Sequence, residues 1–222
     1  MSDSQFSSKD IARESALSTN KVLRNTYALL SVTLIFSALM AVVSTMVNTS
    51  YAVSLGCSVG ALALIWFVLP KTANSAAGIG VVFAFTGLLG FGLGPLLNHY
   101  LSMANGSELI ATAMGGTAAI FLGLSGYALT TQRDFSFLGG FLFAGLLVVL
   151  MGALAGIFLQ MPGLYLAINA AVILLFSGFI LFDTSRIVNG GETNYIMATT
   201  GLYLGIYNIF TSLLHLLGFA SD

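Results

Sequence analysis

The sequence predicts an all-α integral membrane protein, a bundle of seven transmembrane helices. Three observations support this fold class: an excess of apolar residues, a scarcity of charge and seven long apolar runs. Hydrophobic residues make up 57% of the 222-residue chain and charged residues only 7%, whereas a soluble domain carries about 25% charged residues. So little charge cannot solvate the surface of a soluble domain. The net charge of −1 also gives no electrostatic reason to expect nucleic-acid binding.

Each apolar run is close to the ~20 residues that an α-helix needs to cross the hydrocarbon core. Short connections rich in Asn, Gly, Pro and Ser separate the runs and leave no room for a soluble domain between them. A transmembrane β-barrel would show alternating strands of about ten residues, which these unbroken runs do not resemble. The predicted spans are residues 27–47, 51–69, 77–98, 109–130, 136–158, 164–187 and 196–218.

The polar segment 1–26 predicts a flexible tail, followed by a single transmembrane domain over 27–219. The tail lacks an apolar stretch followed by a cleavage site, so we expect no cleaved signal peptide. With seven spans, all seven basic residues fall on the side of the membrane that holds the tail. The positive-inside rule therefore predicts a cytoplasmic N-terminus and an outside C-terminus. The basic residues are Lys9, Arg13, Lys21, Arg24, Lys71, Arg133 and Arg186.

Glycines indicate where the helices approach one another closely. The i,i+4 pairs Gly56/Gly60, Gly152/Gly156 and Gly201/Gly205 permit close helix contact in lipid. Four further glycines and Pro95 crowd residues 87–95, at the end of the third span. This cluster predicts either tight packing or a bend or break in that helix.

Polar residues recur every four positions along the last span and form one stripe, which we expect to face the bundle interior. Two interpretations stay open: the stripe forms hydrogen bonds between helices, or it lines a path for ions. The candidate pore-lining residues are Thr199, Tyr203, Tyr207 and Thr211, with Asn208 on a neighbouring face and His215 extending the stripe.

Asp183 is the acidic residue embedded in a long apolar run; the other seven acids lie in tails, connections or span edges. A carboxylate at membrane depth is costly unless it meets water or a partner, so it marks a candidate functional site. Arg186 lies three residues on, on the same helical face. Three roles are open for this candidate ion or pH-sensing pair. They are a structural ion pair, a cation or proton site, and a protonation switch, because burial disfavours the charged form of a carboxyl group.

Enzymatic chemistry finds little support in the sequence. Ser125 lies in a G-x-S-G motif within a membrane helix, but a serine nucleophile needs a base within hydrogen-bond reach. Of the two histidines, His99 belongs to an outer connection and His215 lies near the outer end of the last span, so both are far in depth from Ser125. The sequence contains no metal-binding or nucleotide-binding motif. We therefore predict no enzyme, no catalytic residue, no metal site and no cofactor.

Several motifs together resemble the Bax inhibitor-1 (transmembrane BAX inhibitor motif) family, in a bacterial branch that modulates the membrane-anchored, ATP-dependent AAA protease FtsH. They are NKVLRNTY at 20–27, AFTG at 84–87 through GPLLN at 94–98, RDFSFLGG at 133–140, and FDTSR at 182–186 through GGETNY at 190–195. The resemblance implies seven helices in the bacterial inner membrane, with the last helix central and surrounded by the others.

The resemblance implies two functional themes. Some family members are pH-sensitive calcium leak channels, in which an aspartate matching Asp183 pairs with a second aspartate in the last helix. The matching position here is Gly205, so this carboxylate pair is missing. The alternative function is a pH-sensitive calcium or cation leak channel with Asp183 in the pore or gate, and with calcium or protons as the permeant ions. The main prediction is a modulator of the protease, acting by protein–protein interaction within the lipid bilayer. A long polar tail suits engagement by a protease, and its handle candidates are Lys9, Asp10, Arg13 and Glu14.

Overall fold

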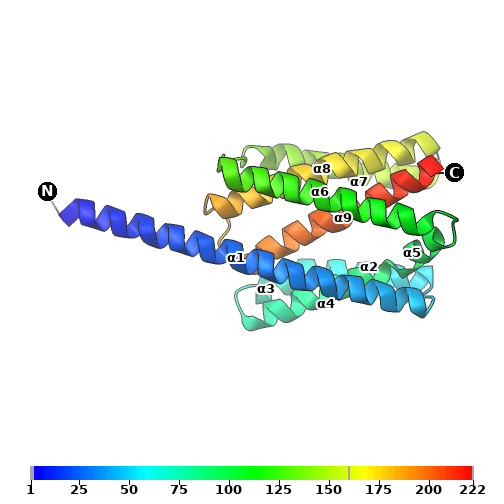
Figure 1. Cartoon of the computed structure of the whole chain (residues 1–222), viewed down its shortest axis with the longest axis horizontal. Helices are drawn as coiled ribbons and strands as arrows, with labels where there is room; N and C mark the ends of the chain where they lie inside the picture. Colours follow the sequence, from blue (N-terminus) through cyan, green and yellow to red (C-terminus); the bar gives the residue numbers. More distant parts are fainter. Residues whose placement is uncertain (1–2, 160, 222) are drawn as a thin grey trace.

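The computed structural model describes the backbone of residues 3–159 and 161–221, and the side chains of residues 17–156, 158–159 and 161–221. Over this part of the chain the regular structure is helical, with no strand. Seven helical stretches are long and apolar enough to cross a membrane. The predicted all-α, seven-span class is thereby confirmed (Figure 1).

The helices follow the predicted spans, and most extend a few residues beyond them. In chain order they are α1 (Asp3–Met46), α2 (Tyr51–Ala63), the π-helical segment η1 (Leu64–Val68), α3 (Leu69–Thr72), α4 (Ala76–Gly92), α5 (Gly94–Leu101), α6 (Gly106–Thr131), α7 (Leu138–Leu159), α8 (Pro162–Val188) and α9 (Tyr195–Ser221). The backbone of α1 is helical from Asp3, so the predicted tail and the first span share one helix. The flexibility of the tail stays a prediction.

The second span changes its helical geometry around one proline. Pro70 lacks an N–H group, and its ring would clash with the carbonyl group four residues earlier in an ideal helix. The π-helical turn η1 lies directly before this position, and α3 begins with the proline in its first turn. Widening of the helix at η1 accommodates the proline within a span that runs from Tyr51 to Thr72.

The third span breaks at the glycine cluster. Helix α4 ends at Gly92, α5 begins at Gly94, and Pro95 lies in the first turn of α5. Glycine disfavours helix continuation and proline cannot donate a hydrogen bond back to the preceding turn. The interruption at Leu93 is one of the two alternatives that the glycine cluster left open.

The same glycine cluster also brings α1 and the third span into close contact. A Cβ atom at Gly87 would lie 2.7 Å from the Phe36 ring. One at Gly90 would meet the backbone of Ser37, and one at Gly94 would meet Ser44. Tight packing and the break are therefore both present, and they are joined at the same residues.

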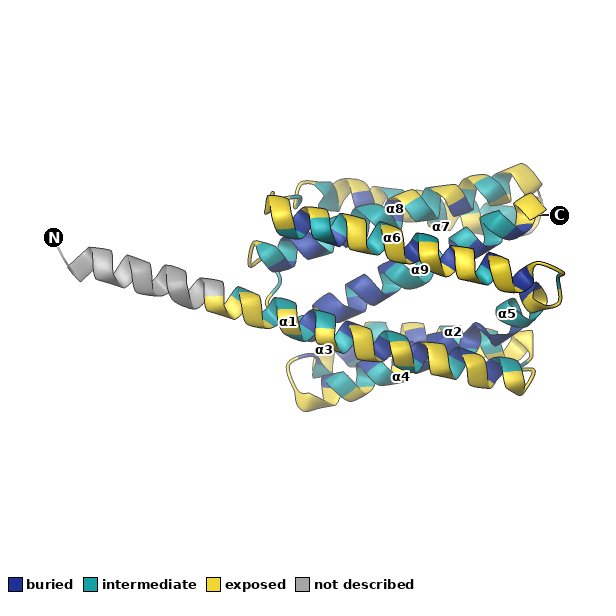
Figure 2. Ribbon diagram, in the orientation of Figure 1, coloured by how far each residue is buried: buried dark blue, intermediate teal, exposed yellow. Residues whose placement is uncertain are grey.

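The helices form two groups, α1 to α5 and α6 to α8, and α9 runs obliquely between them (Figure 1). Helix α9 packs against α8, α6, α1 and α4. Most of its buried apolar residues lie in the main apolar core together with residues of α1, α4 and α8, such as Leu30, Phe85 and Ile180. Helix α7, in contrast, packs mainly against α8 and exposes most of its surface (Figure 2).

The two ends of the bundle differ in charge. The end from which α1 projects, here called the tail end, also contains the α3–α4, α6–α7 and α8–α9 connections (Figure 1). The opposite end is called the far end. The described basic residues all lie toward the tail end, on the N-terminal part of α1, at the end of α3, in the α6–α7 connection and in the last turn of α8.

Candidate functional site at the α8–α9 junction

The carboxyl group of Asp183 lies against the backbone of α9 at Gly201. A Cβ atom added to Gly201 would come within 2.6 Å of the Asp183 Oδ2 atom. The absence of a side chain at Gly201 therefore provides the space that the carboxyl group occupies. Gly205, the position expected to match a second aspartate, lies one turn away and packs against Ile180, at 2.8 Å from Cγ1 to an added Cβ. The residue of α9 that faces Asp183 is Gly201.

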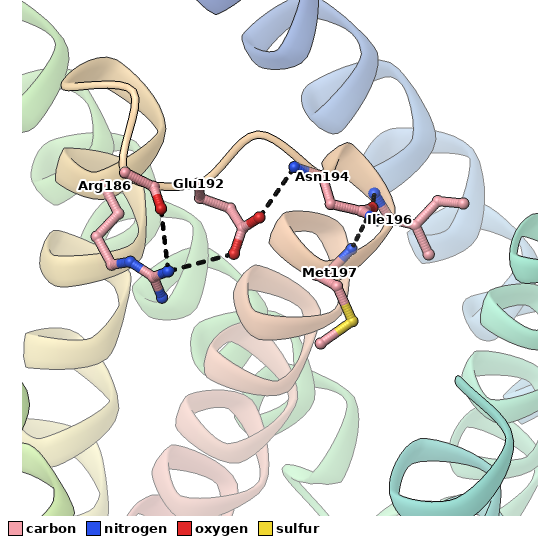
Figure 3. A network of polar contacts seen from close by, with 6 residues as sticks. Arg186, Glu192, Asn194, Ile196 and Met197 are labelled. Atoms are coloured by element: carbon pink, nitrogen blue, oxygen red, sulfur yellow. Dashed lines mark hydrogen bonds and ion pairs between the residues drawn. The ribbon is translucent and has the colours of Figure 1, made fainter. Parts of the chain in front are cut away.

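The Arg186 side chain extends toward the α8–α9 connection (Figure 3). Its Nη2 atom donates to the Gly191 carbonyl at 3.2 Å and forms an ion pair with the Glu192 carboxylate at 3.5 Å. The guanidinium carbon also lies 5.5 Å from the centre of the Phe182 ring. Among the described side chains, Arg186 and Glu192 form the ion pair whose nitrogen–oxygen distance is within 4 Å. Asp183 and Arg186 therefore do not pair directly. The roles of Asp183 as an ion site or protonation switch stay predictions.

Asn194 caps helix α9 and joins two connections of the tail end. Its Oδ1 atom accepts hydrogen bonds from the backbone N–H groups of Ile196 at 2.9 Å and Met197 at 3.2 Å (Figure 3). Asparagine is a favoured residue at this position because it satisfies N–H groups that the first helical turn leaves free. Its Nδ2 atom donates to the Ala73 carbonyl at 3.0 Å and to the Asn74 side chain at 2.8 Å, in the α3–α4 connection.

The last turn of α8 holds the α6–α7 connection in the same way. The Ser185 hydroxyl donates to the Arg133 carbonyl at 3.0 Å and accepts from the Phe135 N–H at 2.9 Å. The Asn189 Nδ2 atom also donates a hydrogen bond to the Arg133 carbonyl at 3.3 Å. The α8–α9 junction, residues 182–194, therefore connects all three tail-end connections through hydrogen bonds.

Ser125, the residue of the G-x-S-G motif, packs beside this junction. Its hydroxyl group is buried and lies 3.2 Å from the Thr184 hydroxyl. This contact joins α6 to α8 and gives Ser125 a structural role. The prediction that the motif reflects helix packing agrees with this geometry.

The polar stripe of α9 faces neighbouring helices, as predicted. Thr199 is fully buried and donates to the Tyr195 carbonyl at 2.7 Å and the Thr26 carbonyl at 3.3 Å. The Tyr203 hydroxyl lies 2.6 Å from the Ser37 hydroxyl and 3.2 Å from the Thr86 carbonyl. These contacts join α9 to α1 and α4, and they favour the interhelical interpretation of the stripe.

The remaining stripe residues form mostly local contacts. Tyr207 stacks on Tyr203 with 6.3 Å between ring centres. Thr211 and Asn208 donate to the carbonyl groups of Tyr207 and Leu204, one turn earlier in the same helix. Their role as pore-lining residues stays a prediction.

His215 lies away from the junction, beside a cavity near the far end. The cavity has a volume of about 610 Å³ and is formed between α7, α8 and α9. The His215 ring lies 5.5 Å from the Tyr165 ring, and Asn169 also lines the cavity. These groups are separate from Asp183, so the structure does not join the two ionisable residues into one site.

Two further predictions concern residues outside the junction. The handle candidates Lys9, Asp10, Arg13 and Glu14 lie outside the residues whose side chains the structure describes. Among the described residues, no group of three or more His, Cys, Asp or Glu side chains is arranged to hold a metal ion.

The connection before α7 contains an exposed carboxylate that lies outside the membrane spans. Asp134 lies in the exposed α6–α7 connection, and its Oδ1 atom accepts the Ser136 N–H at 2.8 Å. Hydrogen bonds from the Ser136 side chain, and then from its backbone, lower the pKa of Asp134 below its ordinary value. The carboxylate therefore stays charged and stabilises the turn that leads into α7.

The junction contains residues that sequence reasoning left without a role. Asn194, Ser185 and Glu192 each contact a different segment, although only Asp183 and Arg186 were singled out as a site. A local signal was present for Asn194, because an Asn directly before an apolar periodic run is typical of a helix N-cap. The partners of Ser185 lie about fifty positions away in the chain, and no local pattern indicates them.

Comparison with known proteins agrees with this architecture. The family described as "Inhibitor of apoptosis-promoting Bax1" matches residues 19–222. The chain is 57% identical over 209 residues to "Modulator of FtsH protease YccA" of Escherichia coli K12, covering 94% of each chain. It is 51% identical to a membrane protein of Vibrio cholerae, again over 94% of each chain, and 49% identical to a Pseudomonas aeruginosa protein over 90% of this chain and 89% of that one. The chain therefore belongs to the Bax inhibitor-1 family.

Proposed function

We propose that this protein modulates a membrane-anchored, ATP-dependent protease of the FtsH type through protein–protein contacts in the bacterial inner membrane. The observation that supports this most strongly is the 57% identity over 94% of both chains to the E. coli modulator of FtsH. A second E. coli relative with the same identity and coverage is named "Inner membrane protein YccA". Neither name describes an enzyme, in agreement with a regulatory role.

The distribution of charge supports an N-terminus in the cytoplasm. Basic residues of membrane proteins are concentrated in cytoplasmic connections, and the described basic residues of this chain lie toward the tail end. A cytoplasmic tail end makes the α1 extension accessible to a cytoplasmic protease domain. The C-terminus then lies outside after an odd number of spans.

The arrangement around α9 supports a stable membrane domain behind this tail. Helix α9 is the central element of the proposed arrangement because it contacts helices of both groups, α1 and α4 on one side and α6 and α8 on the other. Buried hydrogen bonds such as Tyr203 to Ser37 connect it to α1, the helix that continues into the tail. A protease that engages the tail would meet a domain that resists extraction.

The pore alternative has weaker support. The Thr199, Tyr203 and Thr211 hydroxyl groups already contact backbone carbonyl groups or other hydroxyl groups. A path for cations would have to break these contacts. The carboxyl group of Asp183 faces the bare backbone of Gly201, with no second carboxylate opposite.

Deletion of residues 2–17 tests the role of the tail. The protein should still insert, because residues 18–46 of the first span remain and exceed the ~20 residues that a helix needs to cross the membrane. Its degradation by the protease should slow, and its inhibition of the protease on a second membrane substrate should strengthen. A matched control replaces residues 2–17 by a Gly/Ser linker of the same length, which separates tail sequence from tail length. Unchanged turnover and inhibition would contradict the handle, and failure of the full chain to co-purify with the protease would contradict the whole proposal.

A further inference from the structure

A shallow groove lies on the membrane-facing surface near the tail end, apart from the α8–α9 junction. It has a volume of about 390 Å³ and runs between α1, α4 and the start of α9. Asn25 and Tyr195 supply polar groups to it. The remaining lining is apolar and consists of Ala28, Leu29, Val32, Ile79 and Phe83. The groove is therefore amphipathic, with apolar walls and uncharged hydrogen-bonding groups.

Two basic residues extend this groove toward the tail. Lys21 lies one helical turn before Asn25, and Arg24 lies one turn before Ala28, in the continuous helix α1. Residues four apart in a helix share a face, so both cations lie on the face that forms the groove. Both are exposed. Among the described side chains, neither has an ion-pair partner within 4 Å.

We propose that this groove binds one anionic phospholipid. The phosphate group lies between Lys21 and Arg24, where arginine offers paired N–H donors that suit phosphate oxygens. Asn25 and Tyr195 donate hydrogen bonds to the headgroup or the glycerol ester groups. One acyl chain lies along Ala28, Val32 and Phe83, in the apolar part of the groove. Basic pockets between transmembrane helices are a known type of site for anionic headgroups.

The order of chemical groups along α1 favours a lipid over a protein helix. From the tail toward the membrane interior, the face presents two cations, one amide and then apolar side chains. A phospholipid has the same order, with an anionic phosphate group, polar ester groups and an acyl chain. The site is independent of the proposed contact with a protease.

Native mass spectrometry of the full chain tests this site. The protein is released from micelles that contain equal amounts of dioleoylphosphatidylglycerol and dioleoylphosphatidylethanolamine, which have the same acyl chains. We expect the wild type to retain one phosphatidylglycerol in preference to the zwitterionic lipid. The double variant Lys21→Gln/Arg24→Gln should bind phosphatidylglycerol about tenfold more weakly than the wild type, because each basic residue contributes to the attraction of anionic lipid.

A matched double variant, Lys71→Gln/Arg133→Gln, removes the same charges from the same end of the bundle. Both of these residues are exposed and do not line the groove. The control should keep the wild-type preference for phosphatidylglycerol. Equal losses in the two double variants would overturn the proposal, because general electrostatic attraction would then explain the binding. Equal retention of the two lipids by the wild type would overturn it as well.

A second pair of variants tests the apolar part of the groove. Ala28→Phe fills the groove beside Val32, whereas Ala38→Phe adds the same side chain at an exposed position of α1 outside the groove. Phosphatidylglycerol retention should fall about tenfold for Ala28→Phe and stay unchanged for Ala38→Phe. Equal retention by the two variants would overturn the proposed position of the acyl chain. Unchanged lipid retention with a loss of co-purified protease in Ala28→Phe would assign the groove to a protein helix instead.

Discussion

Helices α7 and α9 both run from the tail end to the far end, yet they occupy opposite environments. In the apolar 18-residue stretch of α9, 39% of the residues are buried, whereas in the corresponding stretch of α7 only 6% are buried. Helix α9 contacts helices of both groups, whereas α7 packs mainly against α8. The sequence difference behind this is polarity, since α9 contains the Thr, Tyr, Asn and Ser residues that α7 lacks. In lipid, polar side chains select the protein interior and apolar ones can face the bilayer.

The two helices also use the same glycine pattern differently. Added Cβ atoms at Gly201 and Gly205 of α9 would lie 2.6 Å and 2.8 Å from atoms of α8. Added Cβ atoms at Gly152 and Gly156 of α7 would lie 3.4 Å and 3.7 Å from Ile168, at ordinary contact distance. An i,i+4 glycine pair permits close packing, but the pair alone does not show that close packing occurs.

The largest effect that tests this comparison is expected at Gly205. Gly205→Ala places a methyl group against Ile180, which is fully buried and cannot move into free space. Overpacking of this kind costs about 1–3 kcal/mol. The free energy of unfolding in detergent micelles, measured by titration with a denaturing detergent, should fall by that amount.

Gly156→Ala is the matched control in α7. It should leave the free energy of unfolding unchanged or raise it slightly, because space is available and alanine favours a helix more than glycine does. If the two alanine variants lose stability equally, the glycine pairs are equivalent, and the contrast between α7 and α9 is wrong.

An intermediate effect is expected at the two turns that begin these helices. Asn194→Ala removes the cap of α9 and the hydrogen bonds to Ala73 and Asn74. Loss of a cap costs about 0.5–2 kcal/mol, so the midpoint of thermal unfolding in micelles should fall measurably. Asp134→Ala, at the exposed turn before α7, should produce a smaller shift. A larger shift for Asp134→Ala would contradict the view that α9 depends more strongly on its connection.

The smallest effect concerns pH at the start of α7. Because the pKa of Asp134 is lowered on folding from 3.8, its contribution to stability is present above pH 3.8 and is lost as the pH falls through the lowered value. Unfolding midpoints measured from pH 5 to pH 2 should therefore decrease slightly more for the wild type than for Asp134→Asn. Ser136→Ala should reduce this difference because it removes the larger cause of the lowered pKa. Identical pH profiles of the wild type and Asp134→Asn would exclude this contribution.

The number of spans and the interior position of the α9 stripe could be predicted from local pattern. Apolar runs of sufficient length indicate spans, and the four-residue spacing from Thr199 to Tyr203 places both side chains on one face. The break between α4 and α5 was also predictable, because Gly92, Gly94 and Pro95 each disfavour a continuous helix.

Contacts between distant segments could not be predicted in the same way. Asn194 and Ala73 are separated by 121 positions, and sequence pattern does not show which connections meet. The Arg186 side chain was expected near Asp183 because of their spacing. It extends instead toward Glu192 in the connection, since a long cationic side chain reaches the polar end of the bundle and leaves its stem on the apolar surface.

The continuity of α1 has a mechanical consequence. The helix that emerges at the tail end is the same one that packs against α4 and α9, so a force applied to the N-terminus acts along its axis. Such a force loads the Ser37–Tyr203 and Thr26–Thr199 contacts in shear. Several contacts must then yield together before α1 slides out. The first helix under tension is thus among the most firmly held, and the work of unravelling the bundle is concentrated at its first step.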